Sequence, residues 1–246
     1  MGEIASSQVL LAMTAISELS PTEWTAILLS LRVAVVATLV ATPLGIALAW
    51  LLARRDFWGK SVVDALVHLP LVMPPVVTGY LLLLTLGRRG LVGGWLADHL
   101  GIVFAFRWTG AALACGIMSF PLLVRPIRLS IEAVDRRLEQ AAGTLGAPPW
   151  RVFLTVTLPL ALPGVLAGMV LGFAKAIGEF GATITFVSNI PGETQTISSA
   201  IYSLIQTPDG DTAALRLVVV SVVIALSALV ASEWFARRAT KRLHGN

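Results

Sequence analysis

Five long apolar runs, separated by short polar segments, dominate the sequence. Each run is long enough to cross about 30 Å of hydrocarbon, which takes roughly 20 helical residues. Apolar runs of this length, without alternation of apolar and polar residues, are typical of membrane helices and not of barrel strands. We therefore expect helical membrane spans at about residues 24–53, 62–86, 108–124, 160–177 and 215–235.

Proline and polar residues mark where these runs begin and where they bend. Ser20-Pro21-Thr22-Glu23 stands directly before the first run, and it predicts a capping box with proline at the first helical position. Pro43 predicts a kink inside the first span. The second run contains Pro70, Pro74 and Pro75 and is expected to form a single span.

Residues 1–20 are expected to form an N-terminal arm that lies outside the membrane or at its surface. Val9–Ile16 is apolar, but it is too short to cross the bilayer. The arm lacks the basic start of a secretory signal peptide and contains Glu18. We therefore do not count it as a membrane span.

The composition agrees with the bilayer as the solvent for this chain. Hydrophobic residues make up 56% of the sequence and charged residues 13%, whereas soluble domains average about 45–50% and about 25%. The net charge of +4 is spread along the chain. No basic run is interleaved with aromatic residues, so nucleic acid is not an expected partner.

The basic residues are distributed asymmetrically. The segments after the first, third and fifth spans carry three, five and four Lys or Arg residues. With five spans these segments share one side, which the positive-inside rule makes cytoplasmic. The N-terminus is therefore expected outside and the C-terminus, with a tail at 239–246, inside. Residues 21–238 are expected to form one membrane domain with a cytoplasmic loop at 125–158.

Motifs for enzymatic chemistry are missing from the sequence. Gly59-Lys60-Ser61 resembles the end of a phosphate-binding loop, but that loop needs a glycine five positions earlier, where Arg54 stands. His68, His99 and His244 lie far apart and show no zinc spacing. We therefore predict no enzyme, no metal and no cofactor, and no ATPase or hydrolase chemistry in this chain itself.

The loop at 125–158 is more than a linker. Ile131–Gly143 has helical periodicity, Gly146 interrupts it, and Ala147-Pro148-Pro149 starts a new turn. Apolar or small side chains occur here, where cytosol would surround them, at Leu138, Ala141, Ala142 and Leu145. Something should cover these side chains. They either pack against the protein's own helix ends or enter a groove on a cytosolic partner.

The same loop carries a family resemblance. Glu139-Gln140-Ala141-Ala142, then Gly146, then Leu158-Pro159 resembles the EAA loop of ABC-importer permeases. In that family the loop contains a coupling helix that docks on the ATPase subunit. The family pattern has Glu directly before the two alanines, where Gln140 stands here, and this departure weakens the role expected of Glu139. Gly146 is expected to allow a sharp turn with positive φ and to exclude a side chain sterically.

Two further stretches are similar to molybdate permeases among these importers. One runs from His68-Leu69-Pro70-Leu71 to Gly87-Arg88-Arg89-Gly90, and the other is Gly178–Thr196. The resemblance covers residues from about 24 to 234 and is weaker to sulfate permeases. It implies an all-α integral membrane protein with five transmembrane helices, similar to type I ABC importer permeases, in the bacterial inner membrane. It also implies ATP-driven import of molybdate.

The resemblance further implies an assembly. The expected partners are a second copy of this chain, two cytosolic ABC ATPase subunits, an external or periplasmic oxyanion-binding protein and the lipid bilayer. A sulfate or tungstate permease is the alternative within this class. A secondary transporter or channel that works without ATP, and a purely structural membrane subunit, are alternatives from other classes.

The fourth span contains candidates for the pathway or for helix packing. Gly164, Gly168 and Gly172 repeat every four residues, which lets another helix approach closely. The contact is either static packing within one subunit or a moving seam. Lys175 and Glu179 are four residues apart and can share a helix face. They form either a structural ion pair or part of the outer mouth of an anion pathway.

Arg88 and Arg89 are candidates on the outer face. They fall in the loop between the second and third spans, which the charge distribution places outside. There they attract an oxyanion, contact a protein that delivers substrate, or anchor the chain at the membrane interface.

Overall fold

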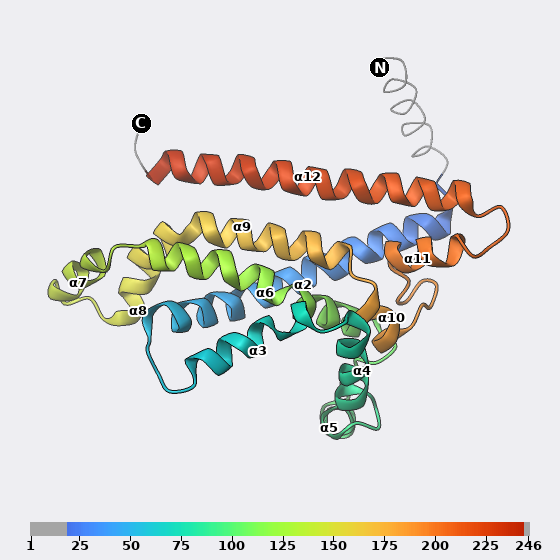
Figure 1. Ribbon diagram of the computed structural model, residues 1–246, viewed down its shortest axis with the longest axis horizontal. Coiled ribbons are helices and arrows are strands. Elements are labelled where there is room, and N and C mark those ends of the chain that lie inside the picture. Colours follow the sequence, from blue (N-terminus) through green and yellow to red (C-terminus); the bar gives the residue numbers. More distant parts are fainter. Residues whose placement is uncertain (1–18, 244–246) are drawn as a thin grey trace, which may run out of the picture. The chain divides into compact units, whose positions relative to one another are not determined.

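The computed structural model describes residues 19–243, with side chains as far as Ala231, and every regular element in that part of the chain is a helix (Figure 1). In chain order the helices are α2 (Pro21–Arg54), α3 (Lys60–Val72), α4 (Pro75–Leu86), α5 (Leu91–Leu100), α6 (Trp108–Ala133), α7 (Arg136–Thr144), α8 (Pro149–Val152), the π-helical stretch η1 (Phe153–Thr157), α9 (Leu158–Ile177), α10 (Gly181–Val187), α11 (Ile197–Leu204) and α12 (Asp211–Leu243). The predicted N-terminal arm lies almost entirely outside the described residues.

Four stretches are long and apolar enough to cross a membrane: α2, α6, the continuous helix Pro149–Ile177, and the part of α12 from Asp211 to Ala231. A fifth candidate is the pair α3 and α4, if the two are counted as one broken span. The predicted all-α membrane fold is therefore confirmed, and the described residues contain the five predicted spans when α3 and α4 are counted as one.

The first span begins as its sequence predicts. The Ser20 N–H donates to Glu23 Oε2 over 2.6 Å, and the Glu23 N–H donates to Ser20 Oγ over 3.2 Å. These reciprocal bonds form the expected capping box, and Pro21 occupies the first helical position. The helix then continues through Pro43 to Arg54.

The second predicted span, in contrast, is interrupted. Helix α3 ends at Val72, and Met73 is extended, with φ −74° and ψ 145°. A residue before proline is disfavoured in the helical region, and here Pro74 and Pro75 follow Met73 directly. Helix α4 restarts with Pro75 in its first turn. The span expected at 62–86 therefore consists of two helices that meet at a sharp break.

Several helices are shorter or longer than the sequence predicts. Helices α5, α10 and α11 occur in segments expected to be loops. Helix α6 continues to Ala133, so the loop expected from residue 125 begins near Val134. The fourth span starts earlier, because α8 and η1 lead directly into α9. Helix α12 continues to Leu243, through most of the tail expected at 239–246.

The chain forms two compact units, and four long helices contribute to both. Of the described residues, the first unit contains 19–36, Pro74–Cys115 and Ile177–Ser227. The second contains Ala37–Met73, Gly116–Ala176 and 228–243.

In the first unit, the start of α2 packs against α11 and the start of α12. Its core consists of buried apolar side chains at Ala26, Ile27, Ile197, Ala200 and Leu217. The buried Glu23 also pairs with Arg216, with Nη2 and Oε1 3.0 Å apart. Helix α4 packs closely on α10 (Figure 1).

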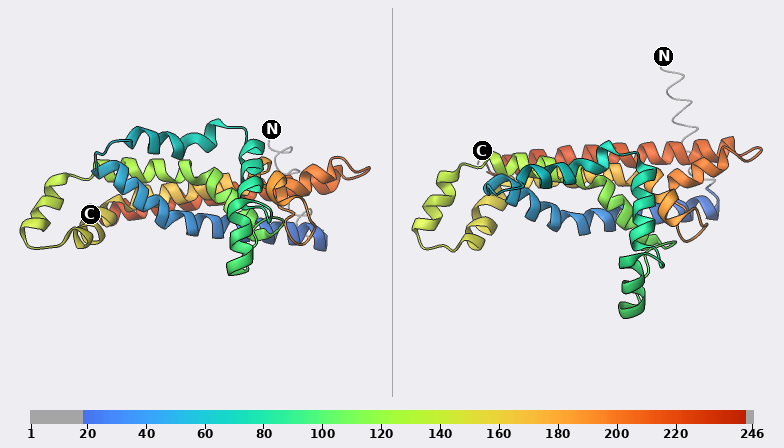
Figure 2. Two further views of the ribbon diagram at one scale, coloured as in Figure 1. Left: turned by 90° about the horizontal axis from the view of Figure 1, so that it is seen from below. Right: turned by 60° about the horizontal axis from the view of Figure 1, so that its bottom comes forward.

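In the second unit, the later part of α2 lies beside α6 and α9 (Figures 1 and 2). Their shared core consists of Ala41, Ala49, Ala53, Leu123, Val124, Ile127, Ile131, Ala161 and Val165. Small residues on α2 and α9 face larger ones on α6, which lets the three helices approach closely. Helices α7 and α8 lie beyond the ends of α6 and α9 (Figure 2).

Candidate coupling loop and outer-face residues

The candidate coupling loop, residues 134–157, starts with a capped helix. Asp135 precedes α7, and its Oδ1 accepts a hydrogen bond from the Arg137 N–H over 2.9 Å. An aspartate in this position satisfies a free amide of the first turn and places negative charge at the helix N-terminus. Asp135 therefore explains why a new helix starts after only two intervening residues beyond α6.

Helix α7 ends in a Schellman motif around Gly146. The Ala147 N–H donates to the Ala142 carbonyl over 3.3 Å, and the Gly146 N–H donates to the Gly143 carbonyl over 3.0 Å. This pair of bonds requires a left-handed residue after the helix. Gly146 provides it, with φ of +86°. The chain then turns sharply into α8, which begins at Pro149.

The steric role expected of Gly146 was wrong. A Cβ atom built on Gly146 would have no heavy atom within 4 Å apart from its chain neighbours. The position is therefore open, and the requirement for glycine comes only from the positive φ, which most side chains disfavour. This distinction changes which substitutions should be tolerated at Gly146.

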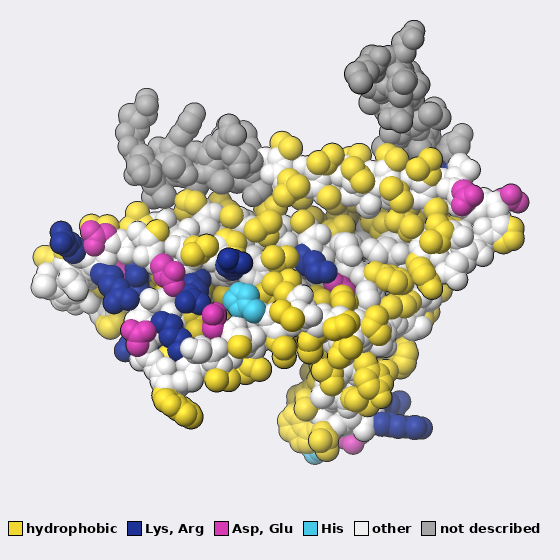
Figure 3. Space-filling model, in the orientation of Figure 1, with side chains coloured by type: hydrophobic (Ala, Val, Ile, Leu, Met, Phe, Trp, Pro, Cys, Tyr) yellow, Lys and Arg dark blue, Asp and Glu magenta, His cyan; other side chains and the backbone are white. Residues whose placement is uncertain are grey.

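Large apolar side chains of the loop are exposed. Leu138 is 50% exposed, Leu145 88% and Trp150 61%, and Gln140 and Ala141 are also exposed. Charged side chains gather around the same end of the second unit (Figure 3). Isolated exposed apolar residues are common, but three on one short helical hairpin favour a partner surface over packing against the protein's own helix ends.

Glu139 faces its own chain. Its Oε1 atom accepts hydrogen bonds from Arg54 Nε (3.1 Å), Arg54 Nη2 (2.9 Å) and Thr157 Oγ1 (2.7 Å). Arg54 Nη2 also donates to the Val134 carbonyl over 3.0 Å. The carboxylate thus joins α7 to the end of α2 and to η1. Sequence reasoning did not foresee these partners of Glu139.

The end of the EAA-like pattern belongs to the membrane helix itself. Leu158 and Pro159 are the first two residues of α9. Leu158 is partly buried and packs against the core of the second unit. The pattern therefore runs from an exposed hairpin into a packed helix, which ties the orientation of the hairpin to α9.

The glycine stripe of α9 lies against α6 of the same chain. A Cβ atom on Gly168 would lie 2.5 Å from the Leu123 carbonyl oxygen, and one on Gly164 would lie 2.6 Å from that of Pro126. At Gly172 the nearest atom would be a Leu123 side-chain carbon at 3.5 Å, an ordinary contact. The contact is thus within one subunit, and a moving seam between α6 and α9 stays a prediction.

The charged pair at the end of α9 is not exposed. Lys175 lies in the last turn of α9 and is half-buried. Glu179 is buried, and its Oε1 accepts the Ala182 N–H over 3.0 Å at the start of α10. Neither residue is without a partner. A structural role for Glu179 is therefore clear, whereas a role in the pathway stays a prediction.

Arg88 and Arg89 lie in the tight turn between α4 and α5, and both are exposed. The next helix, α5, places Trp95 against His99, with ring centroids 5.1 Å apart. Helix α5 was not predicted. Because it follows directly, the two arginines sit on a short connection between two helices and not on a long loop.

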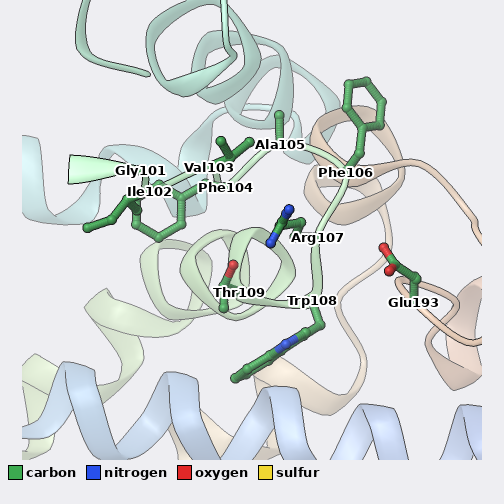
Figure 4. Close-up of a pocket in the computed structure, with 10 residues that line it drawn as sticks. All are labelled: Gly101, Ile102, Val103, Phe104, Ala105, Phe106, Arg107, Trp108, Thr109 and Glu193. Carbon is green, nitrogen blue, oxygen red and sulfur yellow. The ribbon is translucent and has the colours of Figure 1, made fainter. Parts of the chain in front are cut away.

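A pocket of about 570 Å³ opens nearby in the first unit, lined by Gly101–Thr109 and Glu193 (Figure 4). Arg107 and Thr109 point into it, and Trp108 points toward α2. There the Arg32 guanidinium lies 3.7 Å from the centroid of the Trp108 ring. Sequence reasoning missed Arg32, although it is the only charged residue within 24–53, which was the available signal.

Comparison with known proteins places this arrangement in a family. Residues 41–241 match the model of the family described as binding-protein-dependent transport system inner membrane component. The molybdenum transport system permease protein ModB of Escherichia coli (strain K12) is 59% identical over 224 residues, which cover 91% of this chain and 98% of that protein. ModB of Haemophilus influenzae is 57% identical, over 90% of this chain and 96% of that protein.

Solved structures agree on the fold. The crystal structure of a bacterial ABC transporter involved in the import of the acidic polysaccharide alginate matches with a TM-score of 0.72 at 20% identity, covering 95% of this chain and 89% of the other. That identity is low, so the match speaks for the fold alone. With the family match over most of its length, the chain belongs to the family of binding-protein-dependent transport system inner membrane components.

Proposed function

We propose that this chain is the permease subunit of an ATP-driven importer and forms the pathway that carries molybdate across the inner membrane. One observation carries the proposal: the 59% identity to a molybdenum transport permease, which extends over 98% of that relative. Identity at this level over 91% of this chain covers most of its membrane helices, and a pathway has to be lined by such helices.

Sulfate is the second candidate substrate, because sulfate and molybdate share shape and charge. A probable sulfate transport system permease protein of Chlorokybus atmophyticus is 36% identical, but over only 73% of this chain and 63% of that protein. The molybdenum transport relatives match more of the chain at higher identity. This difference favours molybdate, and tungstate is the remaining close analogue.

The proposed assembly contains two copies of this chain, two cytosolic ATPase subunits and an oxyanion-binding protein outside. The exposed Leu138, Leu145 and Trp150 support a docking surface for the ATPase, because a partner would cover them. ATP must then bind one conformation of the assembly better than the other, since a nucleotide can shift an equilibrium only by its difference in affinity.

The distribution of Lys and Arg residues supports one orientation of the chain in the membrane. The candidate coupling loop and the segment after α2 carry most of the basic residues of the loops, which favours the cytoplasm for both. Arg88 and Arg89 then lie outside, where they attract an oxyanion or an acidic surface of the binding protein.

Uptake of radiolabelled molybdate tests the substrate. The chain is expressed with its ATPase and binding protein in cells that lack their own molybdate importer. We expect ATP-dependent uptake that excess unlabelled molybdate and tungstate suppress, whereas a tenfold excess of sulfate leaves it nearly unchanged. Suppression by sulfate at the same concentration as by molybdate would instead make this chain a general oxyanion permease.

Cysteine labelling tests the orientation. In a Cys115→Ala background, Arg89→Cys should react with a membrane-impermeant maleimide in intact cells. Arg137→Cys should react only after the cells are permeabilised. Both side chains are exposed, so access to water does not differ within the chain. The reverse pattern of labelling would invert the proposed orientation.

A further inference from the structure

Two side chains of α7 bond to the membrane helices: Arg136 Nη2 donates to the Ala53 carbonyl over 3.5 Å, and the carboxylate of Glu139 makes shorter bonds. No residue of α7 is buried, so apolar packing holds this helix only weakly. Glu139 makes the shorter contacts between α7 and the membrane helices, because its Oε1 accepts three hydrogen bonds from Arg54 and Thr157. We call Arg54, Glu139 and Thr157 the Glu139 anchor.

The three members of the anchor are shielded from water. The Arg54 side chain is 8% exposed and that of Glu139 is 19% exposed, and Thr157 is 1% exposed. A shielded pair of opposite charges interacts more strongly than a surface pair, and removal of one partner leaves the other charge uncompensated. The anchor is therefore a specific, directional connection and not an incidental surface contact.

The anchor joins elements that belong to different membrane helices. Arg54 is the last residue of α2, the first membrane helix. Thr157 is the last residue of η1, directly before α9. The Leu158 N–H bonds to the Phe153 carbonyl, five residues back. This wide turn adds a residue, which rotates the preceding side chains by about 100° relative to α9, and Thr157 then faces α7 while Leu158 packs in the core.

We infer that the Glu139 anchor transmits movement of the docked loop to α2 and α9, with Glu139 as a positioning residue for transport. The inference rests on the proposed docking of an ATPase at the loop. The ATPase moves the exposed hairpin, and the anchor makes the end of α2 and the start of α9 follow. Without the anchor, α7 can move without carrying the end of α2 and the start of α9 with it.

The test measures binding and coupling separately. Variants Glu139→Ala, Arg54→Ala and the double variant are purified with the ATPase and placed in vesicles with the binding protein. Three quantities are measured: the amount of ATPase that co-purifies, the rate of ATP hydrolysis, and the molybdate imported per ATP hydrolysed. We expect normal co-purification and hydrolysis, with import per ATP reduced about fivefold or more, a usual size for the coupling between two sites.

Two variants act as controls. Asp56→Asn breaks the ion pair between Asp56 and Lys60, whose Nζ and Oδ1 atoms are 2.8 Å apart. This pair lies next to Arg54 in sequence, but its hydrogen bond joins residues only four apart, so import per ATP should not change. The hydrogen bond and the charge of Lys60 lower the pKa of Asp56, so the control removes an interaction that favours the charged carboxylate.

Thr157→Val keeps the shape of the side chain and removes one hydrogen bond to Glu139. It should reduce import per ATP less than Glu139→Ala does. It also serves as the decisive variant if Glu139→Ala does not reach the membrane. Because Arg54 and Glu139 act as one pair, the double variant should be no worse than either single variant.

Leu145→Asp separates the inference from the proposed function. This substitution should abolish co-purification of the ATPase, because Leu145 is the most exposed apolar side chain of the loop. If Leu145→Asp keeps its ATPase and transports normally, the proposed docking is wrong. If Leu145→Asp behaves as expected but the anchor variants import molybdate at the normal ratio to ATP, docking stands and the inference is overturned.

Discussion

The candidate coupling loop and the contact between α6 and α9 both depend on glycine, but for opposite reasons. Gly146 is exposed, has φ of +86°, and has open space where a side chain would lie. Gly168 is buried inside a regular helix, and a side chain there would meet the backbone of α6 at 2.5 Å. One position requires a backbone conformation, and the other requires the absence of a Cβ atom.

Gly146 belongs to an exposed surface, whereas Gly168 belongs to a close contact between packed helices. Around Gly168 the helices fit closely and cannot accept added volume without moving. Around Gly146 the side chains of Leu138 and Leu145 are exposed. There only the backbone conformation of the turn has to be kept. Substitutions that add volume should therefore act on the folding and stability of the chain in the first region, and substitutions that change the turn should act on docking in the second.

The largest effect is expected within the glycine stripe. Gly168→Ala places a methyl group against the Leu123 carbonyl, whereas Gly172→Ala places one at an ordinary 3.5 Å contact with Leu123. Overpacking of a close contact costs about 1–3 kcal/mol. We expect Gly168→Ala to lower the thermal stability of the purified protein by several degrees, and Gly168→Leu to prevent the chain from folding.

Gly172→Ala is the matched control, since it makes the same change four residues along the same helix. It should leave stability close to that of the native protein. Equal losses of stability at Gly168 and Gly172 would contradict the distances on which the comparison rests, and would indicate a contact that loosens along its whole length.

Much of this scaffold was predictable from sequence. The bilayer demands about 20 apolar residues for each span, so α2, α6, α9 and the apolar part of α12 are visible as long runs. The short helices α5, α10 and α11 were missed because 7–10 residues leave no such length signal. The break at Met73 was missed because apolar length was given more weight than two adjacent prolines.

The candidate site was predictable from the sequence only where neighbouring residues determine the structure. Gly146 is followed by Pro148 and Pro149, and this local pattern predicted the turn. The partners of Glu139 depend on the tertiary fold, because Arg54 is 85 residues away in sequence and Thr157 is 18 away. No spacing rule links them, and the π-helical turn that positions Thr157 has no sequence signature that could have been used.

A smaller effect is expected at Gly146, and its pattern should differ from that at Gly168. If only the positive φ matters, the cost depends on how well a residue tolerates the left-handed region and not on its size. Asparagine enters this region readily, whereas a β-branched residue does so at a cost of roughly 1–2 kcal/mol. Gly146→Asn should therefore be nearly neutral, and Gly146→Val should disturb the Schellman turn.

Co-purification of the ATPase with each Gly146 variant provides the measurement, with thermal stability of the permease alone as the reference. Asparagine and valine are similar in volume, so a steric site would reject both. We expect Gly146→Asn to hold its ATPase, and Gly146→Val to hold several-fold less while the membrane helices melt at the native temperature.

If both variants lose the ATPase equally, the partner itself fills the open space beside Gly146, and the docking surface extends onto the turn. If neither loses it, the turn lies outside the docking surface, which is then confined to α7 and α8.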